Sequence, residues 1–209
     1  MSIIDQIRDK TAVGDMNTVA ELTNQAIADG IAPDDIIQHG LIEAMTIVGD
    51  KFKKNEIYVP EMLIAARAMK TALGILKPLM VGQEAKRLAK VVIGTVKGDL
   101  HDIGKNLVSI MMEGAGIEVM DLGVDVAPEK FLEAIKAHQP QFLAMSALLT
   151  TTMPNLKTTI DVVAEAGVDQ NLKVLIGGAP VTQKFADEIG ADGYADNAAT
   201  AVDAIKALL

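Results

Sequence analysis

Residues 88–104 read LAKVVIGTVKGDLHDIG and pass from an apolar strand into a polar loop. The β-branched run Lys90–Val96 is of the kind that is buried in parallel sheets, and Asn106–Glu113 after the loop has the apolar spacing of a helix. Ligands of open α/β sheets bind at loops that follow the carboxyl ends of the strands. This stretch therefore predicts both the fold class and the place of the functional site.

Two residues of this loop, Asp99 and His101, form the candidate chemical centre. In an extended loop, side chains two residues apart project from the same side, so the Asp99 carboxylate can reach one ring nitrogen of His101 and leave the other free. Carboxylates prepare histidines for metal binding in this way. The alternative is a solvated turn whose aspartates cap the following helix, and this motif alone leaves both interpretations open.

The composition narrows the classes of function. The chain has 209 residues, of which half are apolar, enough for one large or two modest domains with a real core. A formal net charge of −9 and a pI near 4.8 argue against nucleic acid or an anionic membrane as the main partner. No apolar run approaches the ~20 residues of a membrane span and the N-terminus lacks a signal-peptide layout, so we expect a cytoplasmic protein.

The chain offers few ligands for a metal. It has no cysteine, which excludes disulfides, thiolate catalysis, iron–sulfur clusters and cysteine zinc sites. Of its three histidines, His39 and His138 lie in helical patterns and are expected at the surface or at a helix end. A zinc site usually takes three or four side chains, so the single loop histidine, His101, is better suited to a metal that arrives in its own macrocycle.

The sequence pattern of the first 86 residues predicts only helices. Their apolar positions recur at spacings of three and four, and glycine, proline and charged residues mark the breaks between helices. The helices are expected at Ile3–Thr11, from Asn17 to about Asp29, from Pro33 to Phe52, and from Pro60 to about Lys77. Short connections between helices of this length predict a four-helix bundle, which we assign to residues 1–86.

After a charged linker at residues 83–87, the pattern changes to a repeated strand, glycine-rich loop and helix. The expected strands are Lys90–Val96, Glu118–Leu122, Phe142–Ser146, Lys173–Ile176 and Asp192–Ala195. The expected helices are Asn106–Glu113, Pro128–His138, Pro154–Ala166, Thr182–Ile189 and Ala198–Leu208. Regular alternation with right-handed crossovers predicts a flavodoxin-like domain at residues 87–209, with a five-stranded parallel sheet covered on both faces.

Two more loops follow strands of this sheet. Residues 146–152 carry four hydroxyl side chains, which offer hydrogen bonds, and Gly177-Gly178 offers close approach to the backbone. Together with the histidine loop they line one edge of the sheet, where a phosphate or a nucleotide-like tail could lie. The glycine-rich motifs of dinucleotide and ATP sites are missing, so those ligands are poorly supported.

At these three loops the chain resembles the cobalamin-binding family. The resemblance rests on three motifs, Asp99-x-His101-x-x-Gly104, Ser146-x-Leu148 and Gly177-Gly178. The first two are separated by 41 residues and the last two by 28. The helical half resembles the cap that precedes this domain in methionine synthase and in the corrinoid proteins of anaerobic methyltransferase systems. That second likeness rests on Met45-x-x-Val48-Gly49-Asp50-x-Phe52 and on residues 58–62, YVPEM.

The resemblance implies roles for individual residues. His101 would be the lower axial ligand of cobalt, with Asp99 hydrogen-bonded behind it and the hydroxyl of Thr152 supporting Asp99, where the family has a serine. The displaced nucleotide tail of the corrinoid would run past Ser146 and the glycine pair. The full set of implied cofactor-binding residues is Gly98, Asp99, Leu100, His101, Asp102, Gly104, Ser146, Leu148, Thr150, Gly177, Gly178 and Ala198, with Gln38, Phe52 and Val59 in the cap.

Two of the cap positions depart from methionine synthase. Val59 stands where that enzyme has a leucine and Gln38 where it has a glutamate, which puts the packing over the methyl face in question. Phe52 matches the aromatic residue that covers this face. Packing in the core of the bundle is the alternative interpretation for both Phe52 and Val59.

The function implied by the resemblance is methyl transport in one-carbon metabolism, with a cobalamin or related corrinoid as cofactor and methylcobalamin as its methylated form. One donor-specific methyltransferase would load the methyl group, a second would pass it to tetrahydrofolate or coenzyme M, and a reductive activator would keep the cobalt active. The chain alone is not expected to turn over. Methylamines, methanol, methoxylated aromatics and betaines all stay open as donors.

Two other classes of function are considered. Cobalamin-dependent light sensors resemble this pairing of cap and sheet, but they add a DNA-binding domain and a cap tryptophan, and this chain has no tryptophan and no basic helix. A flavin or nucleotide protein of flavodoxin type would leave the cap and His101 without a purpose. A corrinoid-carrying subunit is therefore the favoured interpretation.

Overall fold

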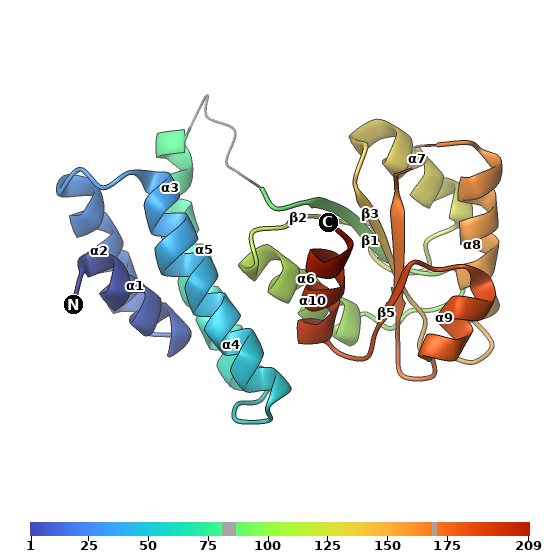
Figure 1. Ribbon diagram of the computed structural model, residues 1–209, viewed down its shortest axis with the longest axis horizontal. Coiled ribbons are helices and arrows are strands. Elements are labelled where there is room, and N and C mark those ends of the chain that lie inside the picture. The colour runs from blue at the N-terminus through green and yellow to red at the C-terminus, as the bar shows by residue number, and fades with distance from the viewer. Residues whose placement is uncertain (81–86, 169–170) are drawn as a thin grey trace. The chain divides into compact units, whose positions relative to one another are not determined.

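In the computed structural model, which describes residues 1–80, 87–168 and 171–209, the chain divides into a helical unit and an α/β unit (Figure 1). The helical unit comprises Met1–Leu88 with Gly114–Gly116, and the α/β unit comprises Ala89–Glu113 with Ile117–Leu209. The linker expected at residues 83–87 lies, apart from Arg87, outside the described residues.

The helical unit packs apolar stripes of its helices around one core, as the spacing of three and four predicts. Its elements are α1 (Ile3–Ala12), α2 (Met16–Ala28), α3 (Pro33–Asp35), the π-helix η1 (Ile36–Ile42), α4 (Glu43–Lys53), α5 (Val59–Leu76) and the 3₁₀ turn η2 (Lys77–Met80). The core side chains are fully or almost fully buried and include Ile7, Val19, Leu41, Met45, Val48, Met62, Met69 and Leu76. Methionine fills irregular gaps in such a core because its side chain is unbranched and flexible.

The segment from Pro33 to Phe52, expected as one helix, is π-helical over Ile36–Ile42. Within η1, Gly40 is buried, and a Cβ atom added there would lie 3.1 Å from Cγ2 of Ile7. The absence of a side chain therefore lets α1 approach closely. π-helical turns are rare, so apolar spacing of three and four in the sequence predicts an ordinary α-helix there.

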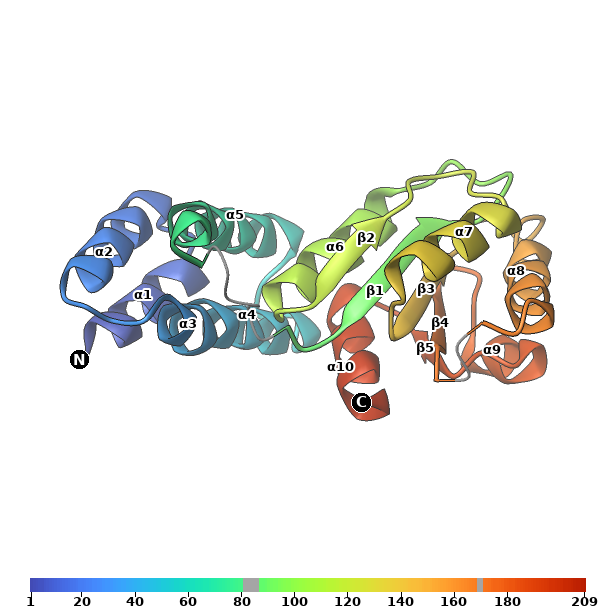
Figure 2. The same cartoon turned by 90° about the horizontal axis from the view of Figure 1, so that it is seen from above.

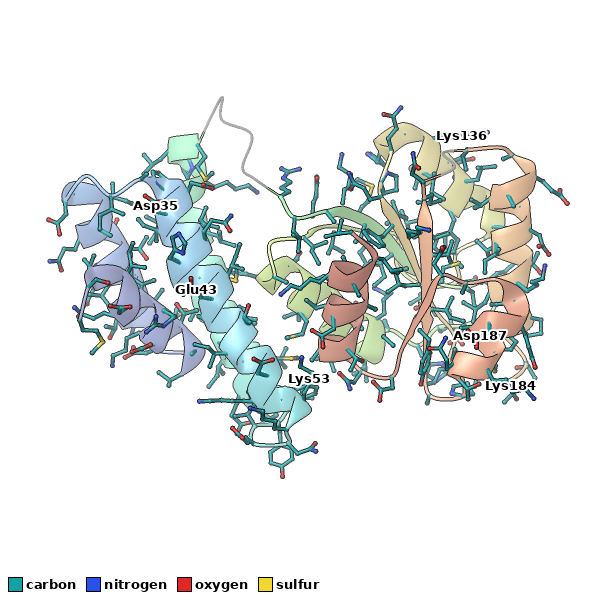
Figure 3. The ribbon with its side chains drawn as sticks, in the orientation of Figure 1. Asp35, Glu43, Lys53, Lys136, Lys184 and Asp187 are labelled. Atoms are coloured by element: carbon teal, nitrogen blue, oxygen red, sulfur yellow. The ribbon has the colours of Figure 1, made fainter. Side chains whose placement is uncertain are left out.

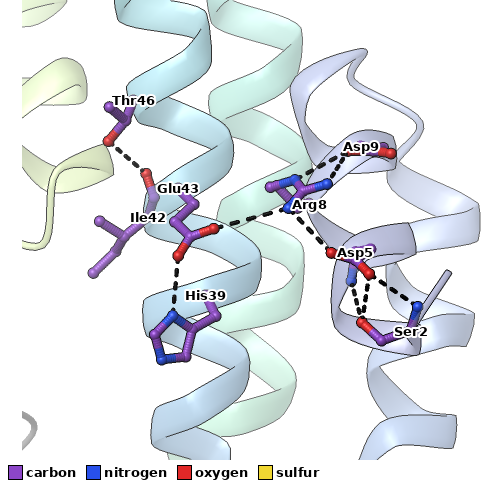
Figure 4. Close-up of polar contacts among 8 residues, drawn as sticks. All are labelled: Ser2, Asp5, Arg8, Asp9, His39, Ile42, Glu43 and Thr46. Atoms are coloured by element: carbon purple, nitrogen blue, oxygen red, sulfur yellow. Dashed lines mark hydrogen bonds and ion pairs between the residues drawn. The ribbon is translucent and has the colours of Figure 1, made fainter.

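Polar contacts link α1 to the end of η1 and the start of α4 (Figure 4). Arg8 lies 3.1 Å from Asp5 and 3.0 Å from Asp9, and its Nη1 is 3.9 Å from Oε2 of Glu43. The other oxygen of Glu43 is 3.0 Å from Nδ1 of His39, whose side chain is 62% exposed. The hydrogen bond to Glu43 raises the pKa of His39. His39 thus lies at the surface and pairs with a carboxylate.

Replacing Glu43 by glutamine (Glu43→Gln) is expected to lower the pKa of His39. The substitution removes the carboxylate that favours the protonated ring, while Asp34 and Asp35 continue to favour it, so the fall is partial. An NMR titration of the His39 ring protons measures the shift, with Glu21→Gln on α2 as the control. An unchanged titration in the Glu43 variant would show that the pair does not form in solution.

Five parallel strands form the sheet, in the order β2-β1-β3-β4-β5. The strands are β1 (Lys90–Thr95), β2 (Glu118–Asp121), β3 (Phe142–Ser146), β4 (Lys173–Gly177) and β5 (Gly193–Ala195). The helices are α6 (Ile103–Gly114), α7 (Pro128–His138), α8 (Pro154–Glu165), α9 (Gln183–Ile189) and α10 (Ala198–Leu208). The expected flavodoxin-like sheet is confirmed, and its central strands are buried, as their β-branched sequences predict.

Helices cover both faces of the sheet. Helices α6 and α10 lie on one face, and α7, α8 and α9 lie on the other (Figures 1 and 2). Charged side chains of the second group, including Lys136, Lys184 and Asp187, are exposed and point away from the sheet (Figure 3). The carboxyl ends of the strands, with their loops, remain as the edge at which a ligand can bind.

One boundary differs from the expectation in a way that matters for the site. Helix α6 begins at Ile103, three residues before the expected start at Asn106, so Gly104 lies in its first turn. The sequence hides this start because Asp102, Ile103 and Gly104 break the amphipathic pattern.

No helix in the described part of the chain combines the length and the apolarity that a bilayer crossing needs.

Candidate functional site

The site is built around the carboxylate of Asp99, which is completely buried at the end of β1. Its Oδ2 atom accepts hydrogen bonds from the hydroxyl of Thr152 at 2.7 Å and from the backbone N–H groups of Leu148 at 2.7 Å and Leu149 at 3.3 Å. Its Oδ1 atom accepts from the backbone N–H of His101 at 3.1 Å. The loop after β3 therefore encloses a side chain of the loop after β1.

The ring of His101 lies against the same carboxylate. Its Nδ1 atom is 2.7 Å from Oδ1 of Asp99, while half of the histidine side chain is exposed. An ionised carboxylate only accepts hydrogen bonds, so Nδ1 must carry the hydrogen in this contact. In the neutral ring the lone pair is then on Nε2, the nitrogen that a metal can take.

The charge on Asp99 is stabilised by hydrogen-bond donors from its own loop and from the loop after β3. Burial alone raises the pKa of Asp99, but hydrogen bonds from the Thr152 hydroxyl, the Leu148 amide and His101 outweigh burial and hold this pKa far below its usual range. Asp99 therefore stays ionised at any physiological pH. The arrangement can present one imidazole nitrogen in a fixed direction at the sheet edge.

The backbone of the histidine loop is also held by residues that sequence reasoning missed. The buried hydroxyl of Thr95 lies 2.9 Å from the carbonyl oxygen of His101 and 3.0 Å from Oγ of Ser146. The side-chain amide of Asn155 donates to the carbonyl oxygen of Lys97 at 2.8 Å. Because a carbonyl only accepts, Thr95 donates to His101, which leaves Ser146 to donate to Thr95.

The other residues expected in the first two motifs are more exposed. Leu100, Asp102, Leu148 and Thr150 are exposed, and Asp102 accepts a hydrogen bond from Asn106 at 3.1 Å. Gly98 has a φ of +80°, a conformation that glycine adopts without strain. The exposed side chains of Leu100, Asp102, Leu148 and Thr150 thus lie in the same loops as the buried Asp99 carboxylate and the half-exposed His101.

The glycine pair after β4 is required by the packing of the protein itself. A Cβ atom at Gly178 would lie 1.9 Å from the carbonyl oxygen of Ala147, and one at Gly177 would lie 3.0 Å from that of Ala195. The close approach expected for a ligand is therefore already used between neighbouring loops and strands. Ala198 is buried at the first position of α10, where Asn197 caps the helix.

The three candidate residues of the helical half lie in the helical unit. Gln38 belongs to η1, Phe52 lies near the end of α4, and Val59 is the first residue of α5. All three are partly buried, so none is a fully enclosed core residue. Their cofactor-binding role stays a prediction.

Several features of the α/β unit fit a large apolar macrocycle that brings its own metal. The two loops around His101 expose four aliphatic side chains, those of Leu100 (71%), Ile103 (78%), Leu148 (40%) and Leu149 (42%). A Cβ atom at Gly104 would meet nothing within 4 Å, so that glycine leaves room beside the histidine. Within residues 1–80, 87–168 and 171–209, no three histidine or acidic side chains cluster as metal ligands.

Comparison with known proteins identifies this macrocycle. A family model described as a B12 binding domain matches residues 89–203, and a second model with the same description matches residues 3–77. The chain belongs to the B12-binding proteins. The cofactor of this B12-binding chain is thus a cobalamin or a related corrinoid, as the three motifs predict.

The relatives of this B12-binding protein extend over nearly its whole length. Trimethylamine corrinoid protein 2 of Methanosarcina acetivorans is 43% identical over 209 residues, which are 99% of this chain and 96% of the relative. A cobalamin-binding protein of Desulfitobacterium hafniense has a similar structure, with a TM-score of 0.81, 30% identity, and coverage of 99% and 98%. The methanol:cobalamin methyltransferase complex of Methanosarcina barkeri gives a TM-score of 0.86 and 32% identity, with coverage of 98% and 77%. The resemblance to corrinoid proteins is confirmed.

The substitution Asp99→Asn is expected to lower the free energy of unfolding of the apoprotein at pH 7 by about 1–3 kcal/mol, because an amide replaces one acceptor by a donor that faces other donors. A group whose pKa is lowered by folding stabilises above its unfolded pKa and loses this effect as the pH falls through its folded pKa. The difference from the wild type should therefore shrink below about pH 4.

Urea unfolding at pH 7 and pH 3 measures this difference, with Asp102→Asn as the control because Asp102 is exposed in the same loop. Equal effects of the two substitutions at pH 7 would contradict the burial of the Asp99 charge.

The substitution Thr152→Val is expected to cost about 1–3 kcal/mol of stability, because a buried carboxylate loses one of its donors while the side-chain volume is kept. Thr152→Ser keeps the hydroxyl and should recover most of this loss. The control is Thr151→Val at the neighbouring exposed position. Unfolding free energies that rank serine with valine at position 152 would show that the hydroxyl does not support Asp99.

Proposed function

We propose that the chain is the methyl-carrying corrinoid subunit of a methyltransferase system. The observation that carries the proposal is the half-exposed His101, whose Nδ1 is engaged by a buried, ionised Asp99 so that Nε2 is available to a metal. The named relatives, one a trimethylamine corrinoid protein and one a methanol:cobalamin methyltransferase complex, support it. When bound, the corrinoid supplies a cobalt nucleophile that accepts and releases a methyl group.

The residues of this chain would bind and orient the cofactor. His101 would hold the metal of the cofactor through Nε2, and Asp99 and Thr152 would fix the direction and the tautomer of its imidazole. The loops at Ser146 and Gly177 would receive the tail. We further propose, on the resemblance, a cap at residues 1–86 that contacts the cofactor through Gln38, Phe52 and Val59, and a cobalamin-binding domain at residues 87–209.

A carrier of this kind acts between other proteins. One donor-specific methyltransferase would load the methyl group, and an acceptor methyltransferase would remove it to tetrahydrofolate or coenzyme M. A reductive activator would restore cobalt that has been oxidised. Methylamines and methanol are the donors that the relatives favour.

Axial ligation is tested by reconstitution with a cobamide that lacks a coordinating base. Electron paramagnetic resonance of the cobalt(II) form should then show splitting from one nitrogen, which His101→Ala removes while the protein stays folded. The control is His138→Ala, at the exposed end of α7. Splitting that survives in the His101 variant would overturn the assignment of this ligand.

Methyl transport is tested separately. The reconstituted protein is mixed with a trimethylamine-specific or a methanol-specific methyltransferase and its labelled donor, and the expected uptake is one methyl group per bound corrinoid. His101→Ala should slow this uptake, because the imidazole that would hold the metal of the cofactor is removed. Uptake from none of the donor enzymes would contradict the carrier role and leave corrinoid binding intact.

A further inference from the structure

The loop between β2 and α7 carries a carboxylate, Asp125, that contacts the histidine loop twice. Its backbone N–H donates to the carbonyl oxygen of Asp99 at 2.9 Å, and its Oδ1 atom accepts from the backbone N–H of Gly98 at 2.6 Å. These two bonds hold the main chain at Gly98 and Asp99, and Asp99 is the residue that orients His101. The hydrogen bonds to the Asp99 side chain fix its carboxylate and leave the main chain at Gly98 and Asp99 uncontacted.

The position of Asp125 is fixed by its own flanking residues. Its φ of +52° lies in the left-handed region, which costs energy for any residue with a Cβ atom, so the surrounding contacts must impose it. Before Asp125, the carbonyl oxygen of Gly123 accepts from the backbone N–H of Thr95 at 3.0 Å. After it, the backbone N–H of Val126 donates to the carbonyl oxygen of Thr95, also at 3.0 Å. The carboxylate is thereby held at Gly98.

The same segment also holds the far end of the histidine loop. Asp121, the last residue of β2, accepts from the backbone N–H of Gly123 at 2.8 Å and forms an ion pair with Lys105. Lys105 lies in the first turn of α6, and only 4% of it is exposed. The segment Asp121–Asp125 thus contacts both ends of the loop that runs from Gly98 to Lys105.

We infer that Asp125 is a positioning residue for His101: by fixing the main chain at Gly98 and Asp99, it aligns the Asp99 carboxylate with Nδ1 before any cofactor binds. Thr152 and the Leu148 amide anchor the side chain of Asp99 from the loop after β3. Asp125 anchors its backbone from the loop after β2. A carboxylate is oriented only when both its side chain and its backbone are fixed. Such preorganisation lowers the entropic cost of ordering the His101 ring when the cofactor binds. The inference rests on the proposed role of His101.

The variants are chosen to separate the carboxylate from backbone strain. Asp125→Gly removes the acceptor, and glycine adopts the positive φ without cost. Asp125→Asn keeps an Oδ1 acceptor, and asparagine tolerates this conformation, so it should restore the wild-type behaviour. Asp125→Glu keeps the charge and displaces the oxygen, and it serves as the second variant if the glycine variant does not fold. Gln139→Gly is the control, at another left-handed residue, φ +46°, at the end of α7.

The first measurement uses the apoprotein. Nitrogen NMR of the His101 ring should show a hydrogen-bonded Nδ1–H in the wild type, in Asp125→Asn and in Gln139→Gly, and its loss in Asp125→Gly. The second uses the full chain reconstituted with a base-free cobamide. In the cobalt(II) resonance, the ratio of nitrogen-coordinated to uncoordinated cobalt should fall roughly tenfold in Asp125→Gly, the effect of one hydrogen bond to a charged group.

The outcomes separate this inference from the proposed function. If the wild type shows nitrogen coordination and Asp125→Gly matches it in both measurements, the inference is overturned and the function stands. If the wild type shows no nitrogen coordination, the ligand role of His101 within the proposed function fails, and the apoprotein spectra decide the role of Asp125: a lost Nδ1–H signal supports it, and an unchanged signal overturns it. A loss in Asp125→Asn equal to that in Asp125→Gly would also overturn it.

Discussion

The buried charge of Asp99 is the constraint on which the rest of the site depends. An isolated carboxylate without water is very unfavourable, so its oxygens must be fully hydrogen-bonded or the group becomes protonated. Here the donors are one hydroxyl, three backbone N–H groups and one imidazole N–H. The imidazole donates its N–H to Asp99, and in its neutral form it keeps its other nitrogen for a metal.

The order of the strands brings these donors together. β1 lies between β2 and β3, so the loop that carries His101 has one neighbouring loop on each side. The loop after β3 supplies Thr152 and the amides for the Asp99 side chain, and the loop after β2 contacts the Asp99 backbone through Asp125. Three segments that are distant in the sequence meet because parallel strands end at the same edge. The topology thus supplies both the position and the rigidity of the loop that carries His101.

The sequence is informative where a pattern is local or periodic. Strand β3 and the helices α7 and α10 have the bounds that the sequence predicts, because their apolar patterns mark them, helped by Pro128 at the start of α7 and by Asn197 before α10. The spacing of Asp99 and His101 also anticipates their contact, since it depends only on the geometry of an extended loop. The π-helical turn at Ile36–Ile42 could not be predicted, because it depends on how α1 packs against Gly40. The close approach of Ala195 and Ala147 to Gly177 and Gly178 could not be read from the sequence, and the part of this glycine pair in cofactor binding stays a prediction.

Asp125 and Lys105 show why the remaining part of such a site escapes sequence reasoning. An exposed aspartate after a strand has the composition of an ordinary turn, and its importance lies in two bonds to the main chain of another loop. A lysine in the first turn of a helix is usually solvated, but this one is buried beside Asp121. A hydrogen bond to a main-chain atom does not depend on the side chain of the contacted residue. The sequence therefore carries no motif for such a bond, and only the fold reveals it. The chemistry of the proposed metal ligand, His101, is thus visible in that residue and in Asp99, whereas the backbone contacts that we infer to set its direction are not encoded locally in the sequence.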